Sequence, residues 1–122
     1  MSVSVLVVDD SPIARKMLRK ALPADWDITV QEACNGQEAM LAYRAGKVDV
    51  MFLDLTMPTM DGFQVLETLQ AEDLNCFVIV VSADVQPLAR ERALGMGAIA
   101  FVSKPVNAEG IRTVLREYGV MV

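Results

Sequence analysis

The chain has 122 residues and 53% hydrophobic residues, enough for one domain that buries about two thirds of its unfolded surface. Its net charge is −5 and its 11 Lys and Arg residues form no long basic run, so the composition argues against a nucleic-acid partner. The chain contains no histidine, which excludes sites that depend on its own imidazole as a base, metal ligand or phosphoryl carrier.

The first predicted element is an apolar strand over residues 3–8. It stops at Asp9 and follows no basic leader, so it is too short for a signal peptide or a membrane span. We therefore expect a cytoplasmic protein with no membrane partner. Ser11 and the proline after it predict a helix start, and Pro23 predicts its exit. The positions expected to face inward are Ile13, Met17, Leu18 and Ala21.

A second strand is predicted at 28–33 and a third at 48–53, with a helix between them. Asn35 and Glu38 resemble a capping box at the start of that helix, and Gly46 ends it. Its expected inward positions are Ala39, Met40 and Tyr43. Cys34 and Cys76 have no CxxC spacing, so we expect two unbridged thiols in a reducing compartment.

Turn residues fill 56–62, and a third helix follows with Val65, Leu66 and Leu69 inward. Strands are predicted at 77–81 and 99–102, and Pro87 suits the first turn of the helix between them. That fourth helix carries Leu88, Ala89 and Ala93. Asn107 predicts the cap of a fifth helix. Its apolar stripe is expected at Ile111, Val114, Leu115 and Tyr118.

Five strands alternating with five helices predict a single α/β domain spanning residues 1–122. The expected architecture is a doubly wound, flavodoxin-like parallel sheet with strand order 2-1-3-4-5. The switch point then lies between the first and third strands. Asp9, Asp10 and Asp54 would line one crevice there, at the carboxyl ends of these strands.

Asp9 and Asp10 taken alone are as typical of turn residues or helix caps as of a functional site. With Asp54 they form a group of carboxylates that needs a compensating cation. Mg²⁺ fits this group because it prefers hard oxygen ligands, and Mn²⁺ is the alternative ion. Asp54, alone at the end of an apolar run, can act as a nucleophile that forms an acyl phosphate.

Lys104 and Ser82 each follow or end a predicted strand at the same edge. Lys104 has an ordinary interpretation as a solvated charge after a strand, and Ser82 has one as a plain strand terminus. At this edge the ammonium of Lys104 can neutralise carboxylates and a phosphoryl oxygen, and the hydroxyl of Ser82 can donate to such an oxygen. A cis Lys104-Pro105 bond would turn Lys104 inward, and the sequence leaves the isomer open.

Five sequence motifs, in order along the chain at the first, third, fourth and fifth predicted strands, together resemble the receiver domains of two-component response regulators, of the stand-alone chemotaxis-regulator type. They are Asp9-Asp10, Asp54 within the segment 54–62, Ser82-Ala83, Phe101 and Lys104-Pro105. The resemblance covers essentially the whole chain. It implies that Asp54 accepts a phosphoryl group from the phosphohistidine of a histidine kinase or a phosphotransfer protein.

The same resemblance implies roles for the other site residues. Direct Mg²⁺ ligands would be Asp10, Asp54 and the backbone carbonyl of Thr56, with Asp9 acting mainly through water. Ser82 and Lys104 would hold the phosphoryl group, and Phe101 would be the aromatic switch residue. Thr56 and Asp84 occupy positions that tune phosphate lifetime.

Two positions depart from the motility regulators of the family. Phe101 stands where many of them have tyrosine, so it lacks a phenolic hydroxyl. Leu55 stands where the chemotaxis regulator has tryptophan, which leaves Trp26 as the only indole.

The predicted function is a phosphorylation-dependent switch of a protein-interaction face rather than an enzyme with a separate substrate. Phosphoryl transfer and autodephosphorylation would be self-catalysed. The target face would combine the fourth helix, fifth strand and fifth helix, with contacts at Arg90, Arg92, Phe101 and Arg112. A phosphorelay intermediate and a phosphate sink are alternatives. An aspartyl-phosphate hydrolase, similar to the haloacid dehalogenase phosphatases, would need a second acid where this chain has Thr56.

Overall fold

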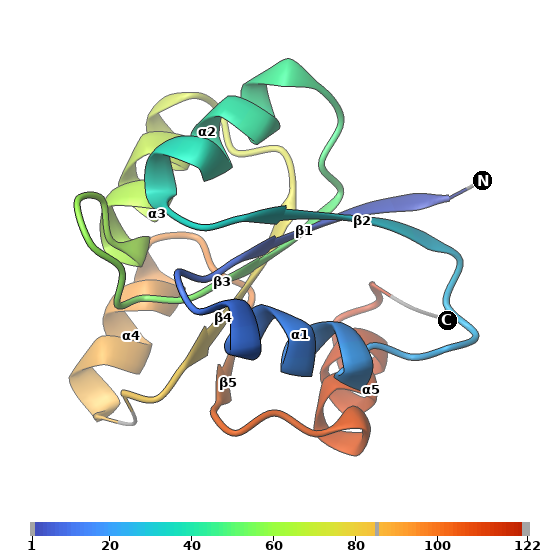
Figure 1. The fold of residues 1–122 in the computed structure, drawn as a ribbon. Helices are drawn as coiled ribbons and strands as arrows, with labels where there is room; N and C mark the ends of the chain where they lie inside the picture. The colour runs from blue at the N-terminus through green and yellow to red at the C-terminus, as the bar shows by residue number, and fades with distance from the viewer. Residues whose placement is uncertain (1, 85, 121–122) are drawn as a thin grey trace.

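The computed structural model describes residues 2–84 and 86–120, and its centre is one five-stranded parallel sheet (Figure 1). The strands lie in the order β2-β1-β3-β4-β5, which is the expected order. Their bounds are β1 Val3–Val8, β2 Ile28–Ala33, β3 Val50–Leu53, β4 Phe77–Ser82 and β5 Ala100–Ser103. The third strand is shorter than expected because its four residues match only the last four residues of β1.

Helices cover both faces of the sheet, with α1 and α5 on one side and α2, α3 and α4 on the other (Figure 1). Their bounds are α1 Pro12–Ala21, α2 Gly36–Ala45, α3 Gly62–Ala71, α4 Pro87–Gly95 and α5 Ala108–Glu117. The central strands are apolar throughout because alternate residues face opposite layers. On β1, Val5 and Val7 pack toward α1 and α5, whereas Leu6 and Val8 pack toward the other three helices.

Side chains at the predicted caps accept backbone hydrogen bonds that satisfy helix N-termini. Ser11 Oγ accepts from the amide of Ala14 at 3.2 Å, and Asn107 Oδ1 accepts from that of Gly110 at 2.7 Å. Asn35 caps α2 as predicted, but the carboxylate of Glu38 accepts from the amide of Cys34 rather than from that of Asn35. A full capping box forms instead at α3, in the segment expected to be a turn, between Asp61 and Gln64.

Several apolar side chains expected to pack inward are exposed. The prediction was wrong for Ile13 and Met17 on α1 and for Tyr118, while Leu18, Ile111 and Leu115 are buried as expected. At about 100° per residue, Ile13 lies roughly 140° around the helix from Leu18, so α1 cannot bury both against one sheet face. Leu88 is also exposed. Apolar residues thus remain on the outer surfaces of α1 and α4.

Cys34 and Cys76 are both free thiols, as predicted. Burial, with a smaller effect of the Asp49 charge, raises the pKa of the Cys76 thiol to about 11. Within residues 2–84 and 86–120, no helix is long and apolar enough to span a bilayer.

Candidate functional site

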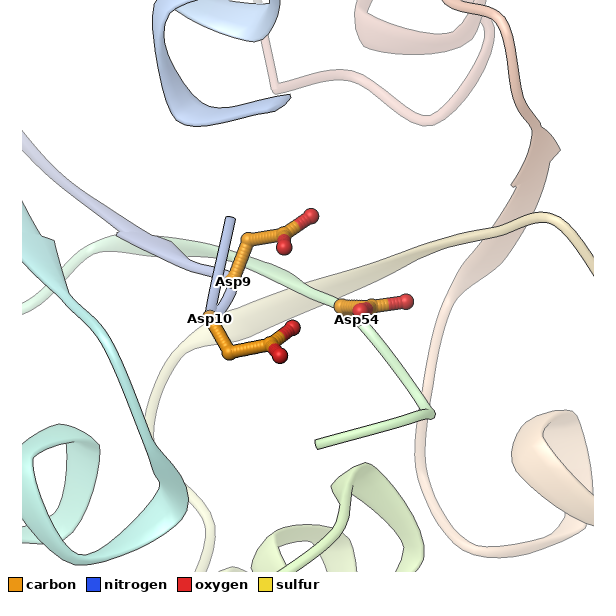
Figure 2. Close-up of side chains that lie close together, drawn as sticks. All are labelled: Asp9, Asp10 and Asp54. Carbon is orange, nitrogen blue, oxygen red and sulfur yellow. The ribbon is translucent and has the colours of Figure 1, made fainter. Parts of the chain in front are cut away.

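The polar residues at the carboxyl ends of the strands converge on one edge of the sheet. Asp9 and Asp10 follow β1 and Asp54 follows β3, and carboxylate oxygens from the three lie within 4.8 Å of one another. Figure 2 shows these side chains side by side at the ends of the two strands. Lys104 follows β5 and contributes the nearest cation. The predicted crevice between the first and third strands is therefore present.

Backbone hydrogen bonds of the sheet continue one residue beyond the strands and hold these positions. The amide of Asp9 donates to Ala33 O at 3.1 Å, and the amide of Asp54 donates to Val8 O at 3.0 Å. The amide of Lys104 donates to Ser82 O at 2.9 Å. The site residues thus sit on the rigid sheet, where their spacing is set by the strand register.

Asp9 and Lys104 form a close ion pair inside the site. Lys104 Nζ lies 2.8 Å from Asp9 Oδ2 and 3.6 Å from Asp54 Oδ1. The other carboxylate oxygen of Asp9 accepts from the amide of Ser11 at 2.9 Å. The Lys104-Pro105 bond, whose isomer the sequence left open, is cis. Burial alone would lower the pKa of Lys104, but the hydrogen bond to Asp9 and the Asp54 charge outweigh it and raise that pKa.

Asp54 is buried in an environment that disfavours its charge. Burial and then the charge of Asp9 raise the pKa of Asp54, while the Lys104 charge and the backbone amide of Thr56 oppose the shift. A cavity of about 350 Å³ lies beside Asp54 and is lined mainly by apolar side chains such as Met17 and Phe52. A further positive charge beside Asp54 would oppose this shift and stabilise its anion.

The donor set fits a hard divalent cation. Within the described part of the chain, Asp10 makes no side-chain hydrogen bond or ion pair, and it is exposed. Asp9 is already engaged by Lys104 and Ser11, so Asp10 and Asp54 have the oxygens that are most available to an ion. Carboxylate oxygens at this spacing, open to water on one side, suit Mg²⁺. A role for the carbonyl of Thr56 stays a prediction.

Gly62 lies against the chain that carries Asp54, a contact that was not predicted from the sequence. A Cβ built on Gly62 would come within 2.4 Å of Asp54 O and 2.7 Å of Leu55 Cα. The amide of Gly62 also donates to Leu55 O at 3.0 Å. The only sequence signal for this approach is a glycine just after the Asp61 cap. The start of α3 thereby fixes the loop that leaves Asp54.

Ser82, Asp84 and Phe101 lie on the β4 and β5 side of the site. Ser82 is fully buried, and its Oγ accepts from the amide of Asp84 at 3.0 Å, which leaves its hydroxyl hydrogen available to donate. The carboxylate of Asp84 accepts from the amide of Gln86 at 3.0 Å. Phe101 is half-buried, pairs in register with Val80, and packs against the core below α2, α3 and α4.

Comparisons with known proteins agree with this geometry. Residues 5–116 match the family model described as the response regulator receiver domain. The chemotaxis protein CheY of Listeria monocytogenes is 35% identical over 116 residues, which cover 94% of this chain and 97% of that protein. The probable transcriptional regulatory protein TcrX of Mycobacterium tuberculosis is 36% identical over 97% of this chain but only 52% of its own length. The signal receiver domain of the putative response regulator NarL from Mycobacterium tuberculosis superposes with a TM-score of 0.87 at 31% identity, covering 99% of this chain and 98% of that one.

Proposed function

The chain belongs to the response regulator receiver domain family, and on this premise we propose that it is a cytoplasmic signalling switch phosphorylated on Asp54. The observation that supports the proposal most is the group formed by Asp54, two further carboxylates and Lys104 at one sheet edge. We propose a histidine kinase or a phosphotransfer protein as the donor, because the chain has no histidine of its own.

In the proposed reaction, a carboxylate oxygen of Asp54 attacks the phosphorus of the donor. A P–O bond forms to Asp54 while the P–N bond to the donor imidazole breaks, and the electron pair leaves with that nitrogen. Mg²⁺ held by Asp10 and Asp54 would supply charge neutralisation at the phosphoryl oxygens. The raised pKa of Lys104 keeps its ammonium charged at neutral pH, so it can also stabilise one of these oxygens.

The proposed output is a change on the face formed by α4, β5 and α5. The Ser82 hydroxyl would donate to the phosphoryl group, and the Phe101 ring would turn into the space that Ser82 leaves. Two of the arginines expected at this face make other contacts: the guanidinium carbon of Arg92 lies 4.0 Å from the centroid of the Phe63 ring on α3, and Arg112 pairs with Asp25 at 2.6 Å. A target that uses these arginines would have to compete with both contacts.

Labelling with radioactive acetyl phosphate in the presence of Mg²⁺ tests the proposed acceptor. The wild type should incorporate label and Asp54→Asn should not. Asp73→Asn is the matched control, because Asp73 is an exposed aspartate remote in sequence from the site, and it should label normally. Full labelling of Asp54→Asn at another aspartate would contradict the proposal.

Calorimetry tests the proposed metal ligands separately. Asp10→Ala should weaken Mg²⁺ binding severely, because it removes the most exposed carboxylate of the cluster. Unchanged Mg²⁺ affinity in this variant would argue against Asp10 as a ligand while leaving the acceptor assignment intact.

A further inference from the structure

Arg15 on α1 reaches back to the backbone that joins two of the site carboxylates. Its Nη1 donates to the carbonyl oxygen of Asp9 at 2.6 Å, and its Nε donates to Glu32 Oε1 at 2.7 Å. Helical side chains incline toward the helix N-terminus, which explains how a residue of the second turn reaches a carbonyl before the helix. The Arg15 side chain is only 16% exposed. Neither the cap nor the proposed reaction requires this contact.

The contact fixes the peptide group between Asp9 and Asp10. The amide side of Asp9 is held by Ala33 in the sheet, and its carbonyl is held by Arg15. The next residue, Asp10, has no side-chain partner within the described residues, so the backbone before it is the contact that constrains where its Cα and Cβ lie. A rotation of that peptide would swing the Asp10 side chain away from Asp54.

We propose that Arg15 is a positioning residue for metal binding, which holds Asp10 in place through the Asp9 carbonyl. The inference rests on the proposed function, because it concerns the same metal site. Glu32 on β2 aligns the guanidinium by accepting its Nε–H, and Arg19 holds the other Glu32 oxygen at 2.7 Å. Arg19 itself is 47% exposed, and no hydrogen bond joins it to Asp9 or Asp10 in the described structure.

Charge and position predict opposite effects when Arg15 is changed. Arg15 is a cation beside an acidic cluster, so its removal should strengthen binding of a divalent cation if only charge matters. If Arg15 acts by position, its removal should weaken that binding. Arg15→Lys separates the two further, because it keeps the charge but cannot reproduce the forked donor geometry of a guanidinium.

The experiment measures Mg²⁺ affinity by calorimetry at one pH for the wild type, Arg15→Gln, Arg15→Lys and Arg19→Gln. We expect both Arg15 variants to bind Mg²⁺ about tenfold more weakly, the usual cost of losing a residue that supports a metal ligand, and Arg19→Gln to stay within about twofold. Arg19→Gln is matched, because it also removes one positive charge from α1 and one bond to Glu32. The backbone amide resonance of Asp10 should shift in both Arg15 variants and not in Arg19→Gln.

The outcomes separate this inference from the proposed function. Wild-type or tighter Mg²⁺ affinity in Arg15→Gln, or wild-type affinity in Arg15→Lys, overturns the positioning role while the metal site stands. An equal loss of Mg²⁺ affinity in Arg19→Gln overturns the positioning role as well. The ion pairs that join α1 to Glu32 on β2 would then be responsible for the effect, rather than the contact of Arg15 with the Asp9 carbonyl. A wild type that does not bind Mg²⁺ overturns the proposed function and this inference together. Should Arg15→Gln not fold, Arg15→Lys carries the same test.

Discussion

Replacing Lys104 by methionine should destabilise the metal-free protein because it leaves two carboxylates without their cation. Asp9 and Asp54 are each 6% exposed, and Lys104 Nζ lies 2.8 Å and 3.6 Å from their nearest oxygens. At an effective dielectric constant of about 20, these separations correspond to gross attractions of about 6 and about 5 kcal/mol. The desolvation of the ammonium offsets much of this.

The net loss should therefore be far smaller than the gross attraction. Breaking a buried pair by removing one partner typically costs about 3–5 kcal/mol. Lys104 is 27% exposed and Asp54 can take up a proton, so we expect about 3 kcal/mol, at the lower end of that range. Urea unfolding in EDTA at pH 7, followed by the fluorescence of Trp26, measures the free energy of unfolding.

Mg²⁺ should restore more stability to Lys104→Met than to the wild type, because the ion replaces the missing positive charge. An ion that binds only the folded state adds about 2.7 kcal/mol at 100 times its dissociation constant, so the effect is measurable. Lys47→Met is the control: Lys47 also lies 3.6 Å from a carboxylate, that of Asp49, but its side chain is 70% exposed. Its loss should cost at most about 1 kcal/mol.

An independent check is the pH dependence of the stability deficit, which is the free energy of unfolding that Lys104→Met loses relative to the wild type. Burial and the Asp9 charge raise the pKa of Asp54 in the folded state above its ordinary value, and Lys104 limits this shift. Without Lys104 the pKa of Asp54 in the folded state rises further. Asp54 then binds its proton still more tightly in the folded state than in the unfolded chain. Stability then falls as pH rises from about 4 through the folded pKa, and the deficit of Lys104→Met should shrink as pH is lowered toward 4. A variant as stable as Lys47→Met in EDTA at pH 7, with no extra response to Mg²⁺, would refute this reasoning.

Asp84→Ala should slow the loss of label from the phosphorylated protein if its carboxylate orients the attacking water, and faster decay would reverse that role. Phe101→Ala and Ser82→Ala should leave acetyl phosphate labelling nearly intact but reduce the gain in target affinity on phosphorylation, measured with a target protein by calorimetry. If both variants kept the wild-type ratio of phosphorylated to unphosphorylated affinity, the Ser82–Phe101 switch would be excluded. Gly62→Ala should destabilise the protein by about 1–3 kcal/mol in urea unfolding, because the added Cβ meets backbone atoms. Gly46→Ala is the control and should not destabilise it, because a Cβ there has nothing within 4 Å; equal stability of the two variants would contradict the close approach at Gly62.

Strands and helix caps could be predicted from the sequence, because they depend on residues that are close together in the chain. The five strands are apolar runs because both of their faces are covered. Ser11, Asn35 and Asn107 act as caps because the partner amide lies three residues away. The alternation of elements predicted a doubly wound parallel sheet, and the order of its strands brings Asp9 and Asp54 to one edge.

The orientation of helices around their axes could not be predicted in the same way. Ile13 and Leu18 look equivalent in the apolar pattern of α1, yet only Leu18 contacts the core. Which apolar residues are buried depends on how the helix lies on the sheet, and that is set by packing against α5 and the strands. The exposure of Met17 and Leu88 could not be predicted for the same reason.

The sequence by itself determined which chemical groups stand at the ends of the strands, because strand ends and caps are local features of the chain. Only the tertiary structure decided which of these groups are partners. Lys104 pairs most closely with Asp9, 95 residues away, and Arg15 bonds to the Asp9 carbonyl while resting on Glu32 of a neighbouring strand. Such contacts depend on strand register and on side-chain reach across elements, to an accuracy of less than 1 Å, and no local pattern in the sequence carries that information.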